Sequence, residues 1–115
     1  MEHRTVRIGL VQNEVSPDAD ENLARTLGLA RKAARQGAGI ICLQELFRTP
    51  YFPQEEAADA SVYAETVPGE STGVFAALSQ EFGNTIIIQH DASFLNFHLL
   101  WKSVVIAEVC ILQLL

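Results

Sequence analysis

The chain has 115 residues and a net charge of −6 at pH 7, and 49% of its residues are hydrophobic. This length is that of one domain or part of one, with enough apolar side chains for a modest core. The eight Lys and Arg residues are scattered and stand against fourteen Asp and Glu residues. This balance argues against a basic surface for the phosphate backbone, so we expect no nucleic-acid partner.

Cysteine usage and hydropathy indicate the compartment. Two cysteines, Cys42 and Cys110, do not make a disulfide framework, so we expect a reducing cytoplasm. The N-terminus carries charges and lacks the apolar core of a signal peptide. The longest uncharged run of the apolar C-terminal part, Val109–Leu115, is far shorter than the roughly 20 residues that span a bilayer. No Cys or His spacing indicates a metal site, and we expect no membrane partner.

The first elements along the chain are a strand and a long helix. Residues Thr5–Gln12 alternate around apolar side chains and are rich in β-branched residues, which favours a strand. Ser16 and Pro17 suit the N-cap and the first position of a helix, and Gly37 suits its C-cap. We therefore predict a helix over residues 17–36. Its apolar face at helical spacing consists of Leu23, Leu27, Ala30 and Ala34.

A short apolar run then ends at an acidic residue. Ile40–Leu43 are bounded by a glycine on one side and prolines on the other, which indicates a buried strand. A strand, a helix of this length and a second strand suit a βαβ crossover with parallel strands. Functional groups in open α/β sheets gather beyond the carboxyl ends of the strands. Glu45 lies in that place.

Two surroundings are open to the Glu45 carboxylate. It is either solvated at the mouth of the strand or held in a partly dry pocket among the neighbouring aromatic residues. In a dry pocket, desolvation favours the neutral carboxyl group and raises its pKa toward the working pH of a general base. From position alone, an ordinary polar residue that opens a loop explains Glu45 as well as a catalytic one does.

The rest of the chain adds helices and a third strand. Residues 54–64 favour a partly helical segment, and Ser71 or Thr72 can cap a further helix that ends at Gly83. The apolar face of that helix carries Phe75, Leu78 and Phe82. Asn84–Gln89 is continuously apolar in its middle, so we expect a third strand that is buried on both faces.

Five segments of the chain form a specific combination. They are the opening VRIGLVQ, the helix start SPDADENL, the glycine before IICLQELF, the PGE turn before STG, and the strand NTIII. Together they resemble the N-terminal portion of a carbon–nitrogen hydrolase of the nitrilase superfamily. The segment QELFRTPYFPQ further resembles the N-carbamoylputrescine amidase branch. The resemblance covers roughly residues 5 to 88 and implies an α/β fold, a partial and truncated α-β-β-α sandwich, in a family that usually forms homo-oligomers.

The resemblance implies hydrolysis of a non-peptide carbon–nitrogen bond by a Glu, a Lys and a Cys. The cysteine thiolate attacks an amide, nitrile or carbamoyl carbon, the glutamate transfers protons, and the lysine stabilises the oxyanion. Only the glutamate maps onto this sequence, at Glu45. For the N-carbamoylputrescine branch the products would be putrescine, ammonia and carbon dioxide, in polyamine biosynthesis. No metal or organic cofactor is implied, and the substrate is a small amide or carbamoyl compound.

The lysine and the cysteine of the family have no counterpart in the expected context. Lys102 lies among apolar residues, where a solvated or snorkelling side chain is the simpler interpretation. Cys42 lies inside the second strand and is interpreted as a small buried hydrophobe. Cys110 has no base or cation beside it in the sequence to lower its pKa. His90 and His98 show no recognisable catalytic partner and favour structural or surface roles.

The family pattern stops near residue 90. We therefore divide the chain into residues 1–90, the N-terminal part of a hydrolase domain, and residues 91–115, an apolar tail that does not match the family. We interpret the tail as a strand or helix that covers the open sheet. Our hypothesis is that the chain is a truncated member of the family whose tail arose from a shifted reading frame.

Two classes of function follow from the sequence. The first is an amidase by descent, with these 115 residues inactive alone, and the second is a non-catalytic α/β fragment or pairing module. Tyr51 and Phe52 are candidate substrate-binding residues, because the loop Arg48–Gln54 could line a substrate mouth. A rigid structural turn explains the proline content of this loop equally well.

Overall fold

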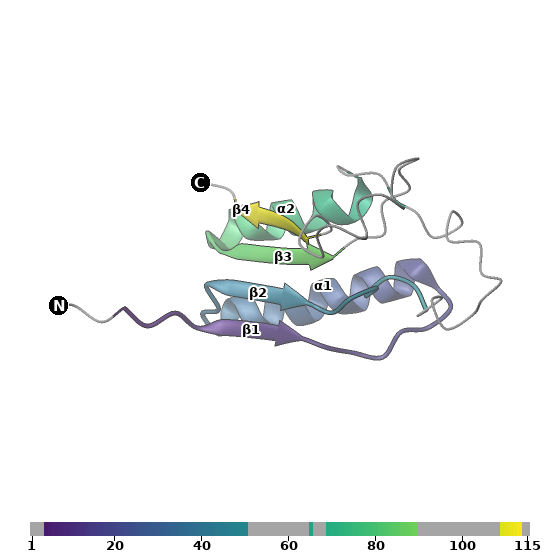
Figure 1. Cartoon of the computed structure of the whole chain (residues 1–115), viewed down its shortest axis with the longest axis horizontal. Coiled ribbons are helices and arrows are strands. Elements are labelled where there is room, and N and C mark those ends of the chain that lie inside the picture. The colour runs from purple at the N-terminus through teal and green to yellow at the C-terminus, as the bar shows by residue number, and fades with distance from the viewer. Residues whose placement is uncertain (1–3, 51–64, 66–68, 90–108, 114–115) are drawn as a thin grey trace, which may run out of the picture.

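The computed structural model describes residues 4–50, 65, 69–89 and 109–113. Within them, four strands form one sheet in the order β1-β2-β3-β4 (Figure 1). The elements in chain order are β1 (Ile8–Val11), α1 (Ala19–Arg35), β2 (Ile40–Leu43), α2 (Glu70–Phe82), β3 (Thr85–Gln89) and β4 (Val109–Gln113). β1, β2 and β3 are parallel, and β4 is antiparallel to β3. The α/β class and the parallel strand-helix-strand start predicted from the sequence are confirmed.

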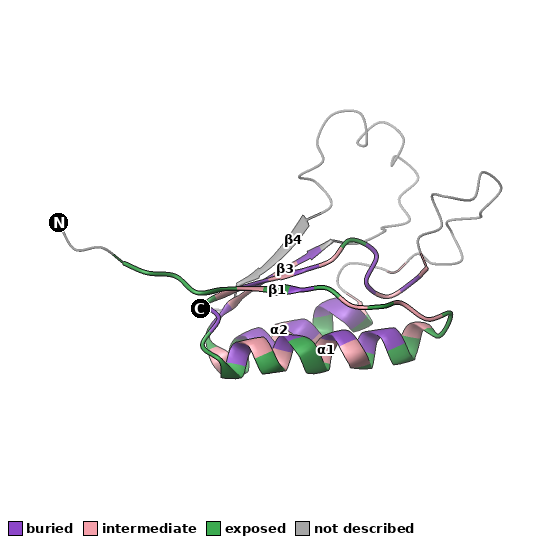
Figure 2. Ribbon diagram, turned by 90° about the horizontal axis from the view of Figure 1, so that it is seen from below, coloured by how far each residue is buried: buried purple, intermediate pink, exposed green. Residues whose placement is uncertain are grey.

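The core lies between the sheet and the two helices, which cover the same face of the sheet (Figure 2). Every second side chain along each strand points toward the helices, and the apolar face of each helix packs against these side chains. The buried core residues are Val11, Ile41, Leu43, Ile86 and Ile88 from the strands, Leu23, Ala30, Ala34, Phe75 and Leu78 from the helices, and Ala38 and Phe47 from the connections. The predicted helix stripes are confirmed, with Leu27 and Phe82 only partly buried at their margins.

The long helix α1 begins two residues later than the sequence predicts. Its N-cap is Asp18, whose carboxylate accepts hydrogen bonds from the backbone N–H groups of Asp20 at 3.0 Å and Glu21 at 3.1 Å. A carboxylate satisfies these unpaired donors and interacts favourably with the helix dipole. The hydroxyl of Ser16, the predicted cap, donates to the Glu21 carboxylate instead. Past the other end of α1, Gly37 has a φ of 88°, the left-handed conformation typical of a glycine that closes a helix.

The second helix α2 begins earlier than predicted and ends as predicted. Its N-cap is Gly69, so Ser71 and Thr72 lie inside the first turn rather than at the cap. The Thr72 hydroxyl oxygen accepts a hydrogen bond from the Gly69 N–H group at 2.6 Å and so caps the N-terminus of the helix. Gly83 is the C-cap, with a φ of 65°.

The face of the sheet away from the helices is apolar and uncovered by them. Val6, Ile8 and Leu10 project from it with exposures of 57%, 58% and 80%. In the register of the sheet, Leu10 aligns with Cys42, and Cys42 aligns with Ile87. Apolar side chains therefore continue in a row across three strands on what we call the open face.

The prediction that the third strand is buried on both faces is wrong. Ile86 and Ile88 are fully buried toward the helices, but Ile87 is only partly buried, because its side chain belongs to the open face. Within the predicted tail, Val109–Gln113 is a strand, one of the two expected forms, and it extends the sheet along the edge of β3. Other predicted features lie outside the described residues, namely the helical segment 54–64 and tail residues 91–108 and 114–115.

The first strand is shorter than the predicted Thr5–Gln12, and its glycine sets how closely it approaches α1. A Cβ atom at Gly9 would lie 3.0 Å from the Cβ of Ala33 and 3.2 Å from the Cβ of Ala38. Neither alanine has a flexible side chain that can move aside. The close contact of β1 with α1 therefore requires glycine at this position.

We predict that Gly9→Ala lowers the free energy of unfolding by about 1 kcal/mol or more, because overpacking a tight contact forces the backbone to shift. The matched control is Gly28→Ala on the exposed side of α1, where a Cβ meets nothing within 4 Å. That change should raise the stability by about 0.5 to 1 kcal/mol. Urea unfolding followed by circular dichroism measures both, and equal effects would contradict the close approach.

We predict that the open face makes this chain self-associate, since exposed apolar patches and an unpaired edge strand favour association. Leu10→Lys should reduce that association, because a buried ammonium group is costly. The matched control is Leu29→Lys, which changes an exposed leucine of α1 on the helix side. Sedimentation velocity over a range of concentrations gives the answer. An equal reduction by both variants would count against the open face as the associating surface.

Candidate active site

The chain makes a tight turn where β2 ends, and this turn carries Glu45. Leu46 has a φ of 52°, which is uncommon for a residue other than glycine and is unfavourable for a bulky side chain. Leu46 and Phe47 are both buried, whereas Glu45 directly before them is exposed. The turn therefore buries two apolar side chains, of which Phe47 joins the core, and leaves the carboxylate outside.

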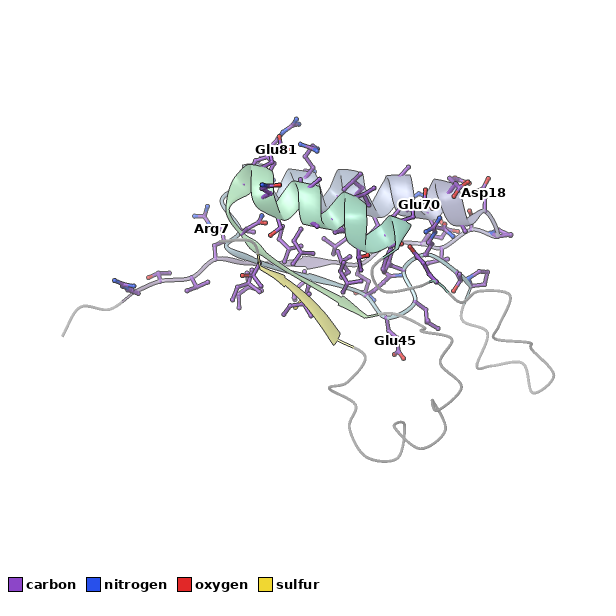
Figure 3. All side chains as sticks on the ribbon, turned by 90° about the horizontal axis from the view of Figure 1, so that it is seen from above. Arg7, Asp18, Glu45, Glu70 and Glu81 are labelled. Atoms are coloured by element: carbon purple, nitrogen blue, oxygen red, sulfur yellow. The ribbon has the colours of Figure 1, made fainter. Side chains whose placement is uncertain are left out.

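Glu45 points away from both helices, on the side of the open face (Figure 3). Of its two possible surroundings, the solvated one is found, and the described residues do not enclose the carboxylate in a dry pocket. Phe47, one of the neighbouring aromatic residues, packs in the core instead of beside the carboxylate. Its ring meets that of Phe75 edge-to-face, with ring centroids 5.6 Å apart and planes at 89°.

A buried asparagine joins the connection after β1 to the turn after β2. The Asn22 side-chain oxygen accepts from the Ser16 N–H group at 2.7 Å, and its amide donates to the carbonyls of Ser16 at 2.6 Å and Arg48 at 2.8 Å. At the start of the turn, the Gln44 side-chain oxygen accepts from the Asn13 N–H group at 2.7 Å. Asn22 was not predicted from the sequence. The one feature that could have indicated it is a polar residue next to the apolar face of the helix.

The Arg48 side chain lies among three carboxylates. One guanidinium nitrogen donates to Glu65 at 3.0 Å and to the Ser71 hydroxyl at 3.1 Å, and another donates to Asp20 at 3.1 Å and to Glu70. Arg48 and Glu65 are only 18% and 17% exposed, whereas Asp20 and Glu70 face water. The ion pair with Glu65 is therefore the most desolvated of the three and the most costly to break.

The charge of Arg48 is constant over the pH range in which a protein folds. Burial lowers the pKa of this guanidinium, but the hydrogen bond to Glu70 and the charges of Glu65 and Glu70 raise it, and the net direction is upward. A pKa raised on folding contributes stability at every pH below the unfolded-state pKa and loses it only at strongly alkaline pH. The Arg48 guanidinium group therefore keeps its positive charge, and its ion pairs depend only on the ionisation of the three carboxylates.

Cys42 lies on the open face of β2 as a free, partly exposed thiol. The prediction that it is buried is wrong, because the described residues leave its face of the sheet uncovered. Several candidate residues fall outside the described part of the chain, namely Tyr51, Phe52, His90, His98 and Lys102. The side chain of Cys110 in β4 is not described, and the loop Arg48–Gln54 is described only as far as residue 50.

The sequence model of the carbon-nitrogen hydrolase family matches residues 7–108. The chain belongs to this family. The nitrilase-superfamily resemblance is therefore confirmed. The match continues beyond residue 90, where sequence reasoning placed the end of the family-like part, and that boundary stays a prediction.

The sequence is similar to the omega-amidases NIT2 of several vertebrates. The protein from Bos taurus is 39% identical over 87 residues, which is 72% of this chain and 29% of the relative. The one from Mus musculus is 41% identical over 81 residues, or 67% of this chain and 26% of the relative. The chain thus spans less than a third of the length of these relatives.

A solved structure supports the fold. The carbon-nitrogen hydrolase from Helicobacter pylori G27 superposes with a TM-score of 0.69 at 22% identity, and covers 80% of this chain and 32% of that chain. This likeness shows that the described elements have the same α/β fold as that structure. Among the residues that the structure describes, no helix has the length and apolar character needed to cross a membrane.

We predict that Asn22→Asp lowers the free energy of unfolding by about 1 to 3 kcal/mol, because an oxygen replaces the buried amide donor that faces the carbonyls of Ser16 and Arg48. The matched control is Asn13→Asp, which removes only one donor, to the exposed carbonyl of Glu14 at 3.1 Å. Its effect should be below about 1 kcal/mol. Denaturant unfolding measures the pair, and similar losses would argue that Asn22 does not hold the two connections together.

Proposed function

We propose that this chain is the N-terminal part of an amidase in which Glu45 carries protons between nucleophile, leaving group and water. The observation that supports this most directly is the geometry of the turn after β2. Glu45 projects at the carboxyl end of a parallel strand while the next two side chains are buried. In a chain of the carbon-nitrogen hydrolase family, a carboxylate at that edge suits a general base and acid.

N-carbamoylputrescine is the substrate that we propose. The segment QELFRTPYFPQ supports it, since this segment resembles that branch of the family. The relatives named omega-amidases make a terminal amide the second candidate. Both are small molecules with a carbonyl group bound to nitrogen, so one carboxylate could serve either by the same proton transfers. We expect the protein to act in the cytoplasm, without a cofactor, and as a homo-oligomer.

We propose further that these 115 residues do not turn over substrate by themselves. Attack on an amide carbon needs an activated thiolate and a cation at the developing oxyanion. No cysteine or lysine of this chain lies in the sequence context that the family's nucleophile and cation have. The exposed Glu45 also lacks, among the described residues, the water-poor surroundings that strengthen such interactions. The alternative function, a non-catalytic pairing module, is favoured by the apolar open face.

The test uses this chain and a chimera in which its residues 7–89 replace the matching segment of mouse omega-amidase NIT2. Ammonia release is measured with N-carbamoylputrescine and with a terminal amide. We expect no release by the chain alone and release by the chimera, which Glu45→Gln lowers by roughly 10² to 10⁴-fold. The matched control Glu14→Gln, at another exposed glutamate, should leave the rate unchanged.

Three outcomes would oppose the proposal. Turnover by the 115-residue chain that disappears in Glu45→Gln would overturn its inactivity. A chimera whose rate is the same with Gln at position 45 would remove Glu45 from the mechanism. Release of ammonia from the terminal amide alone would reject the proposed substrate and keep the amidase.

A further inference from the structure

We infer that Arg48 is a positioning residue, which sets the direction of Glu45 by holding the turn between them. The inference rests on the proposed proton-carrying role of Glu45. Arg48 does not touch Glu45 and lies on the helix side of the turn, where its partners are, whereas Glu45 points to the open face (Figure 3). It acts on Glu45 through the backbone of the two residues in between.

The turn is held at both of its ends. At its start, Gln44 accepts from the Asn13 backbone. At its end, the Arg48 carbonyl accepts from the buried Asn22, and the Arg48 side chain contacts α1, residue 65 and α2. Three separate parts of the chain thus converge on the single residue that closes the turn.

The middle of the turn is the part that this anchoring must hold in place. Leu46 has a left-handed backbone, which is unfavourable for a leucine and persists only where the surroundings over-determine it. Relaxing that backbone would rotate the peptide between Glu45 and Leu46 and would swing the Glu45 side chain. The fork of the Arg48 guanidinium, with several bonds in fixed directions, resists that rotation better than a point charge would.

A purely structural role for Arg48 makes a different prediction. If its ion pairs only held α2 against α1, their loss would loosen both helices and the sheet together. If Arg48 positions the turn, its loss should disturb Glu45 and Leu46 first, while amides in the core strands stay ordered. The two roles are therefore separated by where the disturbance appears.

The experiment compares Arg48→Met, Arg48→Lys and the matched control Arg31→Met in the 115-residue chain. Arg31 also makes an ion pair, with Glu81 at 2.8 Å, but away from the turn. The first readout is the ¹⁵N heteronuclear NOE of Glu45 and Leu46 relative to Ile41 and Ile86. The second is the rate at which a glutamate-specific protease cuts after Glu45.

In Arg48→Met we expect a lower NOE at Glu45 and Leu46, unchanged values at Ile41 and Ile86, and cleavage after Glu45 about tenfold faster, as for local opening. Arg48→Lys should fall between this variant and the natural chain. Arg31→Met should match the natural chain at the turn. An undisturbed turn in Arg48→Met, or equal disturbance of turn and strands, would overturn the inference.

If Arg48→Met does not fold because the charged, mostly buried Glu65 loses this ion pair, the double variant Arg48→Met/Glu65→Gln removes both charges together. The same readouts then apply, with Glu65→Gln as its reference. These measurements need no turnover, so their failure is distinct from that of the proposed function. A mobile turn in Arg48→Met together with an active Glu45→Gln chimera would support positioning of the turn and reject the catalytic role of Glu45.

Discussion

Both helices pack on one face of the sheet, and this one-sided burial governs the rest of the molecule. The side chains that alternate toward α1 and α2 are close to fully buried, and those that alternate the other way remain open. The same strand therefore carries a core residue such as Ile41 and a partly exposed Cys42. Glu45, in the turn that follows this strand, is exposed because its side chain projects on the side of the open face.

The turn after β2 shows how the backbone that carries Glu45 can be held while its carboxylate stays exposed. The burial of Leu46 and Phe47 gives hydrophobic stabilisation, and the edge-to-face contact with Phe75 sets the orientation of the Phe47 ring. Asn22 and Arg48 then hold the backbone where this packing puts it. Enclosure is a separate requirement, and the residues described here do not meet it.

The distribution of charge follows the same division. The three acidic side chains that pair with Arg48 lie on the helix side of the turn and come from three parts of the chain. Glu45 is spatially apart from them, on the side of the open face. A carboxylate kept away from the ion-pair cluster is left available for other partners, which is the arrangement that the amidase proposal needs.

Local chemistry in the sequence predicted much of the fold. The strands beginning near Ile40 and Asn84, the helix ending before Gly83 and the position of Glu45 past β2 all follow from short-range patterns, because glycine, periodicity and apolar runs act over a few residues. The N-cap at Asp18 did not follow, since several residues near it could serve and their competition depends on the folded geometry.

Patterns along the chain were enough to indicate the family, the α/β class and the strand end at which Glu45 lies. The exposure of Glu45, the position of Ile87 and Cys42 on the open face, and the contacts of Asn22 and Arg48 with the turn emerged from the packing of the elements. Exposure and long-range hydrogen bonds depend on which elements pack against each other. A pattern of neighbouring residues does not indicate whether the second face of a sheet is covered.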